Sequence, residues 1–182
     1  MSLLTPMLRS SPLTDWFSDA QRVQGMLDFE AALAQAQAAC GMVPPEAVGP
    51  IVAACRHEAI DFAALGEAAV GAGNLAIPLV KQLTAQVKTR NPEAARYIHW
   101  GATSQDAIDT GLVLQLRGAL DAAETLLEQL LAALALQADR YRDTVMPGRT
   151  WMQHALPVTF GLKLAGTLDA LLRWQQRLRE MR

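Results

Sequence analysis

Cysteine is scarce in this sequence, and its scarcity excludes two classes of protein. The 182 residues include two cysteines. Two cysteines cannot supply the disulfide framework of a small secreted domain, and no Cys/His cluster has the spacing of zinc ligands. Cys40 and Cys55 both lie in Ala-rich helical patterns. We therefore expect both to be small core residues, in a protein of the reducing cytoplasm.

Charge of one sign and long apolar runs are also lacking. The formal net charge is -2 at pH 7, which gives the chain no electrostatic attraction to nucleic acid or to an acidic membrane. No apolar run is as long as a membrane span, and the N-terminus lacks the basic flank and apolar core of a secretory signal. We expect no nucleic-acid partner and no membrane partner.

Aromatic and β-branched residues are few, whereas Ala and Leu are abundant, and this balance favours helices over sheets. Capping residues and Gly/Pro breaks divide the first hundred residues into short helical stretches. The predicted helices cover residues 19–40, 45–56, 61–70 and 75–89, with Ser18 or Asp19, Asp61 and Asn74 as caps, and one further turn begins at Asn91-Pro92-Glu93.

A much longer helix is predicted over residues 105–141, which contain no proline. Leu112 and Leu116 begin an apolar stripe that recurs every three or four residues, and Leu114 and Leu126 lie on a second apolar face. At 1.5 Å per residue such a helix is roughly 55 Å long, too long for a compact monomer. A long coiled coil is one interpretation; we favour the core of a helical bundle that is shared between subunits.

The chain after this helix is broken around Pro147-Gly148, and a last amphipathic helix is predicted from about residue 154. Because the connection is short, we expect the two long helices to be antiparallel neighbours. No strand pattern is clear, although Thr144-Val145-Met146 is compatible with a short extended piece. The predicted fold is all-α, with a small helical domain over residues 1–104 and the first long helices of a bundle over residues 105–182.

The junction before the long helix combines an imidazole, a glycine and two hydroxyls: His99, Gly101, Thr103 and Ser104. Thr103-x-x-Asp106 has the spacing of a capping box, with Asp in place of the usual Glu. Free backbone amides at a helix start, together with the helix dipole, favour a bound anion. An ordinary capped helix explains the capping residues alone; the histidine and the paired hydroxyls favour a binding site.

The junction after the long helix, Gly148–Pro157, contains the second candidate histidine, His154. Histidine is the side chain best suited to move protons near neutral pH, and loops held by rigid helices are common places for sites. A structural hydrogen bond is the alternative for His99 and for His154. No phosphate-binding loop or Gly-x-Ser-x-Gly elbow competes, and Asp106 and Asp109 are better interpreted as helix caps than as a metal pair.

These two junctions resemble the first two signature regions of the fumarase/aspartase superfamily. Ile98-His99-Trp100-Gly101-Ala102-Thr103-Ser104-Gln105-Asp106 with Asp109-Thr110 is similar to the first, and Gly148-Arg149-Thr150-Trp151-Met152-Gln153-His154-Ala155-Leu156-Pro157 with Thr159 and Gly161 to the second. Phe17-Ser18-Asp19 with Arg22 and Glu30 resembles the opening helix of adenylosuccinate-lyase-type members. The pairing of His-Trp-Gly-Ala-Thr-Ser-Gln-Asp with Gly-Arg-Thr-Trp is similar to the lactonising branch, and the resemblance covers essentially the whole chain.

The resemblance implies an all-α homotetramer whose active sites draw on three subunits and use no metal or organic cofactor. Thr103 and Ser104 match positions that bind a substrate carboxylate, and Asn74 falls near another substrate-facing region. His99 and His154 match two histidines near the substrate, with His154 at the general-acid position. Which of the two transfers the proton stays open.

The second signature implies further contacts to a small polycarboxylate substrate, from Arg149, Thr150 and Trp151. Trp151 stands where fumarases and argininosuccinate lyases have a histidine. That departure favours the lactonising reaction, in which 3-carboxy-cis,cis-muconate of protocatechuate catabolism cyclises by adding a carboxylate to a conjugated alkene. An adenylosuccinate-lyase-type elimination and a non-catalytic helical assembly module are the alternatives.

The sequence departs from the family pattern in a third region. The serine- and glycine-rich loop that ends in Met-Pro-x-Lys-x-Asn-Pro, to which the family's catalytic base is assigned, does not occur in these residues. The amphipathic pattern also continues to Arg182 without a stop signal. The resemblance therefore implies that this chain corresponds to the N-terminal portion of the enzyme and that it is inactive alone.

Overall fold

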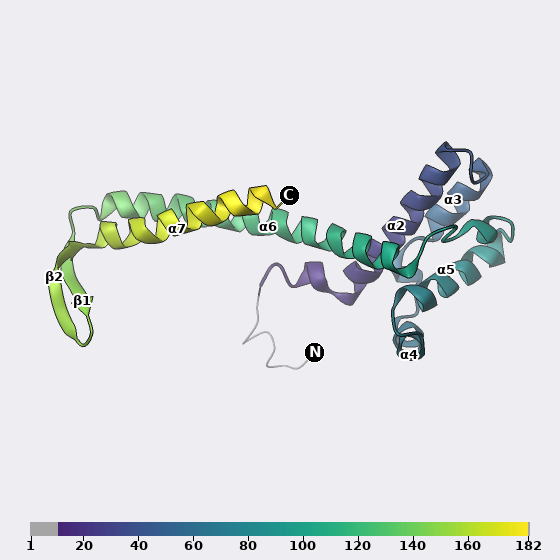
Figure 1. Cartoon of the computed structure of the whole chain (residues 1–182), viewed down its shortest axis with the longest axis horizontal. Helices are drawn as coiled ribbons and strands as arrows, with labels where there is room; N and C mark the ends of the chain where they lie inside the picture. Colours follow the sequence, from purple (N-terminus) through teal and green to yellow (C-terminus); the bar gives the residue numbers. More distant parts are fainter. Residues whose placement is uncertain (1–10, 182) are drawn as a thin grey trace. The chain divides into compact units, whose positions relative to one another are not determined.

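The computed structural model of the chain describes residues 11–181, which contain six α-helices and one two-stranded antiparallel sheet (Figure 1). The all-α class is confirmed, with a small hairpin added. The elements are η1 (Asp15–Phe17), α2 (Asp19–Ala39), α3 (Pro45–Ala54), η2 (His57–Ala59), α4 (Phe62–Ala72), α5 (Ala76–Arg90), η3 (Ala94–Tyr97), α6 (Ser104–Arg140), β1 (Val145–Thr150), β2 (Gln153–Thr159) and α7 (Phe160–Glu180).

The chain divides into two compact units, the first up to Gly118 and the second from Ala119 onward, so the division falls within α6. The predicted boundary lies instead after residue 104, where the long helix was expected to begin, and it stays a prediction. None of the helices in the described range is both long enough and apolar enough to cross a membrane.

The predicted caps begin the short helices of the first unit. The Ser18 hydroxyl accepts the backbone N–H of Gln21, and a carboxylate oxygen of Asp61 accepts that of Ala64. The amide oxygen of Asn74 accepts the N–H of Ile77 at the start of α5. Each bond satisfies one of the amides that a helix start leaves without an intrahelical partner. The predictions for α2, α3, α4 and α5 are therefore confirmed to within a few residues.

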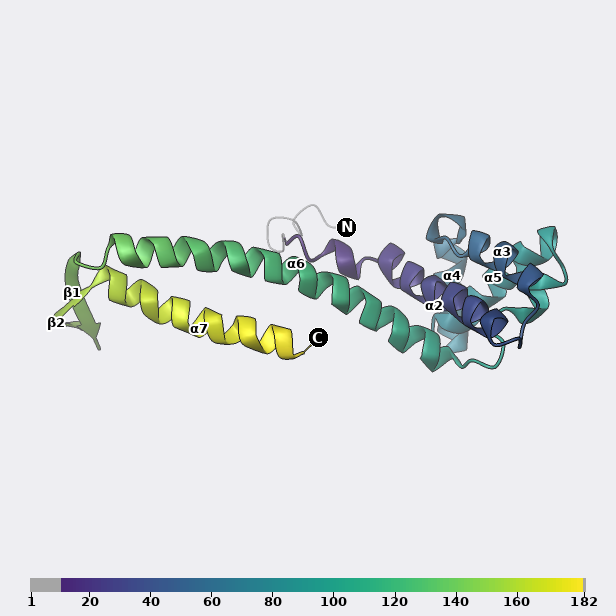
Figure 2. The ribbon, with the colours of Figure 1, turned by 90° about the horizontal axis from the view of Figure 1, so that it is seen from above.

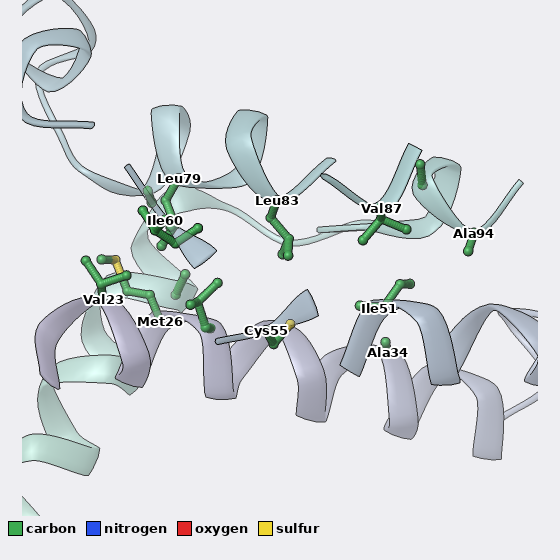
Figure 3. Packing of buried hydrophobic residues seen from close by; sticks show 14 of the residues in the cluster. Val23, Met26, Ala34, Ile51, Cys55, Ile60, Leu79, Leu83, Val87 and Ala94 are labelled. Carbon is green, nitrogen blue, oxygen red and sulfur yellow. The ribbon is translucent and has the colours of Figure 1, made fainter. Parts of the chain in front are cut away.

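The core of the first unit lies between α2 and the helices α3 and α5 (Figure 3). Val23 and Met26 of α2 face Leu79 and Leu83 of α5, and all four side chains are almost fully buried. Cys55 is buried in the same cluster, as predicted, whereas Cys40 is exposed and that prediction is wrong. Cys40 follows the last residue of α2, so it lies beyond the apolar stripe that the helix buries.

The second unit is an antiparallel helix pair closed by a hairpin (Figure 1, Figure 2). The backbone N–H of Gly161 donates to the carbonyl of Tyr141 over 2.9 Å at one end of the pair. Farther along, the Arg179 guanidinium lies 3.1 Å from a carboxylate oxygen of Glu124. The predictions of one long helix, α6, and of an antiparallel partner are confirmed.

The start of the last helix was predicted wrongly, because residues 145–159 form two strands instead of a loop and a first helical turn. The extended piece expected at residues 144–146 is the beginning of β1. Pro157 opposes a helix begun at His154, because a proline disfavours the helical conformation at the residue before it, here Leu156. The helix begins at Phe160, where the Thr159 hydroxyl caps it by accepting the N–H of Leu162 over 3.1 Å.

Candidate functional site

The turn that leads into α6 holds three of the predicted site residues within six positions: His99, Thr103 and Ser104. The carboxylate of Asp106 accepts the Thr103 backbone N–H over 2.7 Å and the Thr103 hydroxyl over 3.0 Å. The acidic half of the predicted capping box is therefore present. The other half is not, because the Thr103 hydroxyl donates to Asp106 instead of accepting a backbone N–H.

This arrangement changes how the turn can bind an anion. Both donors of Thr103 are engaged by Asp106, and these bonds lower the pKa of the Asp106 carboxyl. The half-buried Ser104 hydroxyl has no hydrogen-bond partner among the described residues. Ser104 and the amides of the first turn are thus the groups available to an incoming carboxylate, while Thr103 must exchange partners first.

His99 is fixed by an ion-pair contact from the middle of α2. Its Nδ1 atom lies 2.6 Å from Oε1 of Glu30, whose side chain is 2% exposed. Burial raises the pKa of Glu30, and the hydrogen bond from His99 acts in the opposite direction. His99 also has a φ of 56°, a left-handed conformation that is uncommon for a residue with a β-carbon. The contact with Glu30 therefore holds the imidazole in one position, and the backbone that carries it is in a strained conformation.

A second buried side chain of α2 holds the neighbouring residue. The Gln37 amide donates to the carbonyl oxygen of Trp100 over 2.6 Å. Gln37 lies seven residues after Glu30, two turns along the same face of α2. Two side chains of α2 therefore contact this turn, one at the His99 ring and one at the Trp100 carbonyl.

Asn74 borders a pocket of about 270 Å³ within the first unit. Its other lining residues are Arg22, Met26, Leu75, Ile108, Leu112 and Gln115. The amide oxygen of Asn74 caps α5, which leaves its amide nitrogen for a ligand. Arg22 makes no ion pair within the described residues, so its guanidinium is available to a carboxylate. Ile108 lies one turn along α6 from Ser104, on the same helix face.

The remaining predicted residues lie on the hairpin of the second unit. Arg149 of β1 and His154 of β2 are cross-strand partners, as are Thr150 and Gln153. Trp151 is at the hairpin tip and is 86% exposed. His154 is also exposed, and it lies on a strand, not on the predicted helix. The hairpin therefore presents a guanidinium and an imidazole side by side.

The described residues offer no competing metal centre. Over residues 11–181, no three His, Cys, Asp or Glu side chains are grouped in a way that would hold a metal ion. The groups gathered at the two signature regions are hydroxyls, amides, a guanidinium and imidazoles, which suit a carboxylate-rich organic ligand and proton transfer.

Comparison with known proteins matches residues 8–182 to the family model described as Lyase. The chain belongs to this lyase family, of the fumarase/aspartase superfamily. It is 60% identical over 173 residues to the 3-carboxy-cis,cis-muconate cycloisomerase of Pseudomonas aeruginosa, a match that covers 95% of this chain and 38% of that protein.

Two solved structures of similar enzymes share the fold. The 3-carboxy-cis,cis-muconate lactonizing enzyme from Pseudomonas putida has a TM-score of 0.97 and 55% sequence identity, over 100% of this chain and 42% of that one. The β-carboxy-cis,cis-muconate cycloisomerase from Acinetobacter calcoaceticus has a TM-score of 0.94 and 46% identity, over 98% and 42%. The chain thus spans about two fifths of the length of these members of the lyase family.

Glu30 and Arg22 are among the residues that resemble this lyase family, but the sequence did not predict either of them as a site residue. A signal for Glu30 was available, because Val23, Met26, Glu30 and Ala34 follow the three- and four-residue spacing of the stripe that α2 buries. A carboxylate on an apolar stripe indicates a partner elsewhere in the chain. The sequence does not say which residue that partner is.

Proposed function

We propose that the protein formed with this chain is a lactonising cycloisomerase that converts 3-carboxy-cis,cis-muconate to a carboxymuconolactone. The observation that carries the proposal is the 60% identity to a cycloisomerase, which extends over 95% of the chain. Trp151 also supports the lactonising branch of the superfamily. Fumarases and argininosuccinate lyases resemble this sequence at other positions, but they have a histidine at the position of Trp151. In this proposal the protein acts in the cytoplasm, in protocatechuate catabolism.

The reaction makes three demands on the site. One substrate carboxylate attacks an alkene carbon, so the C–O bond of the lactone forms as the π bond breaks. The electron pair moves to the neighbouring carbon, where a second carboxylate stabilises it as an enolate-like anion. A proton then binds that carbon. The protein must therefore hold several carboxylates, stabilise the developing charge and deliver one proton.

The residues of the two signature regions divide these tasks. Ser104 and Thr103, at the positive end of the α6 dipole, bind one carboxylate of the substrate. Asn74 contacts the substrate from the neighbouring pocket. Arg149 and Thr150 hold a second carboxylate from the hairpin, with Trp151 as an apolar wall. His154 or His99 assists the proton transfer. The proposed chemistry uses no metal or organic cofactor.

The proposed enzyme is a homotetramer in which each site combines residues of three subunits. Exposed leucines of α6 support this assembly, because an apolar helix face needs a neighbour that covers it. In the first unit these are Leu112 and Leu116, and in the second Leu126 and Leu130. In the proposed tetramer, the two signature regions that act on one substrate come from different subunits.

The experiment that tests the function joins this chain to the part of the Pseudomonas aeruginosa relative that lies beyond the matched span. This chimera, and the chain by itself, are assayed on 3-carboxy-cis,cis-muconate and on adenylosuccinate. We expect the chimera to form a lactone, and the chain by itself to form none. A folded chimera that cleaves adenylosuccinate, or that turns over neither substrate, contradicts the proposal.

A further inference from the structure

Glu30 is the one buried carboxylate among residues 11–181, and nothing in the proposed chemistry yet uses it. Its Oε1 atom contacts Nδ1 of His99, whereas its Oε2 atom is buried without a hydrogen-bond partner in the described structure. An ionised carboxylate in such a place is stable only with a matched donor. The imidazole is the donor that the fold supplies.

The contact determines which ring nitrogen of His99 is free. An ionised carboxylate only accepts hydrogen bonds, so in the ionised state of Glu30 the nitrogen that faces it carries the hydrogen. This places the hydrogen on Nδ1 and leaves Nε2 to exchange protons with a ligand. A carboxylate that fixes one ring nitrogen in this way sets the tautomer and the orientation of a catalytic histidine, as in hydrolytic triads.

The backbone around His99 is also held in place. His99 has a left-handed φ of 56°, and the next residue, Trp100, is held through its carbonyl by Gln37. Glu30 and Gln37 project from one face of α2, at 2% and 8% exposure. Two buried side chains of one rigid helix thus hold both the His99 ring and the carbonyl of the residue that follows it.

We propose that Glu30 is a positioning residue, which holds the His99 imidazole with Nδ1 protonated and Nε2 presented to the substrate. The proposal rests on the proposed function, since it assumes that His99 lies at the reacting end of the site. Glu30 itself touches no substrate. Glu30 determines the fraction of molecules in which Nε2 of His99 is correctly placed. Its loss should therefore lower kcat more than it raises KM.

The direct test is spectroscopic and uses the chain itself. The ring nitrogens are labelled with ¹⁵N, and the His99 signals are identified by their loss in His99→Gln. We expect Nδ1 of His99 to carry the hydrogen at about pH 8, where an ordinary imidazole is neutral. In Glu30→Leu the hydrogen should move to Nε2, because leucine offers no acceptor; in Glu30→Gln, whose amide oxygen accepts, it should stay on Nδ1. An unprotonated Nδ1 in the wild-type chain overturns the proposal.

The functional test uses the chimera described above. Glu30→Leu should lower kcat by about 10- to 100-fold, the effect of losing the partner that orients a histidine at other sites, with KM changed less. Glu30→Gln should recover most of the loss, and the exposed control Glu67→Leu should be neutral. A folded Glu30→Leu chimera with unchanged kcat, or with only KM raised, overturns the proposal. If the wild-type chimera forms no lactone, the proposed function fails, and the ring signals still decide whether Glu30 positions His99.

Discussion

Gly25 of α2 and Gly111 of α6 meet backbone to backbone where the two helices cross. A β-carbon added to Gly25 would lie 2.8 Å from the carbonyl oxygen of Gly111, and one added to Gly111 would lie 2.9 Å from the backbone nitrogen of Met26. Real side chains do not approach backbone so closely, so only glycine permits this crossing. The crossing brings the pocket residues of α2 against those of α6.

Gly111→Ala should therefore destabilise the chain, although alanine is the better helix former. We expect the free energy of unfolding to fall by about 1–3 kcal/mol, as for other overpacked positions. The matched control is Gly66→Ala in α4, where an added β-carbon meets nothing within 4 Å. That change should stabilise the chain by about 0.5–1 kcal/mol. Denaturant titration measures both, and equal effects would contradict the close crossing.

Because His99 is paired with the buried Glu30 and His154 is exposed, replacing the two candidate histidines should change stability by very different amounts. His99→Ala leaves the Glu30 carboxylate buried without a partner, which should lower the free energy of unfolding by about 3 kcal/mol. His154→Ala removes an exposed side chain and should change it by less than about 0.5 kcal/mol. The same denaturant titration compares them; a neutral His99→Ala would mean that the pair contributes nothing to the fold.

The two cysteines should react at very different rates with an alkylating reagent. Cys40 is exposed, whereas burial raises the pKa of the Cys55 thiol to about 12. Only the thiolate reacts, so Cys40 should be modified first and Cys55 only when the first unit opens. Because the folded pKa is raised, the neutral Cys55 thiol favours the fold, and this contribution is lost as pH rises past the ordinary value of 9.0. Mass spectrometry over time measures the order; modification of Cys55 first would contradict the packing.

Asp106→Asn tests the cap at the start of α6. Hydrogen bonds from Thr103 lower the pKa of the Asp106 carboxyl in the folded chain. The stabilisation is therefore present above the ordinary value of 3.8 and is lost as pH falls through the lower, folded value. The variant should be less stable than the wild type at neutral pH, and the difference should shrink in acid. Glu67→Gln, an exposed change without such bonds, should show no trend; the same flat profile for Asp106→Asn would contradict the contact.

Local signals in the sequence were enough to predict most of the helices. Ser18, Asp61 and Asn74 form capping bonds at the helix starts where they were expected. Such caps depend on residues three positions apart, so the chain order carries the information. The proline-free length of α6 and its antiparallel partner follow from equally local patterns.

The hairpin and the His99 contact needed information that local patterns do not carry. Residues 145–159 alternate poorly in polarity, because the strands are exposed on most positions and bury no apolar face. The contact between Glu30 and His99 spans 69 positions and depends on how α2 packs against the turn before α6. The Thr103 hydroxyl donates a hydrogen bond to Asp106 instead of accepting one from a backbone N–H. The spacing of the two residues does not determine which of these bonds the hydroxyl makes.

The central claim, that this chain supplies part of a lactonising site, is tested most directly by running the chimera in D₂O. The substrate carboxylates are ionised near neutral pH, so the proton that completes the reaction must come from solvent by way of the protein. We predict one lactone product that carries one deuterium, on the carbon next to a carboxylate, as measured by NMR and mass spectrometry. A product without the lactone ring, or a lactone without deuterium at that carbon, would contradict the account.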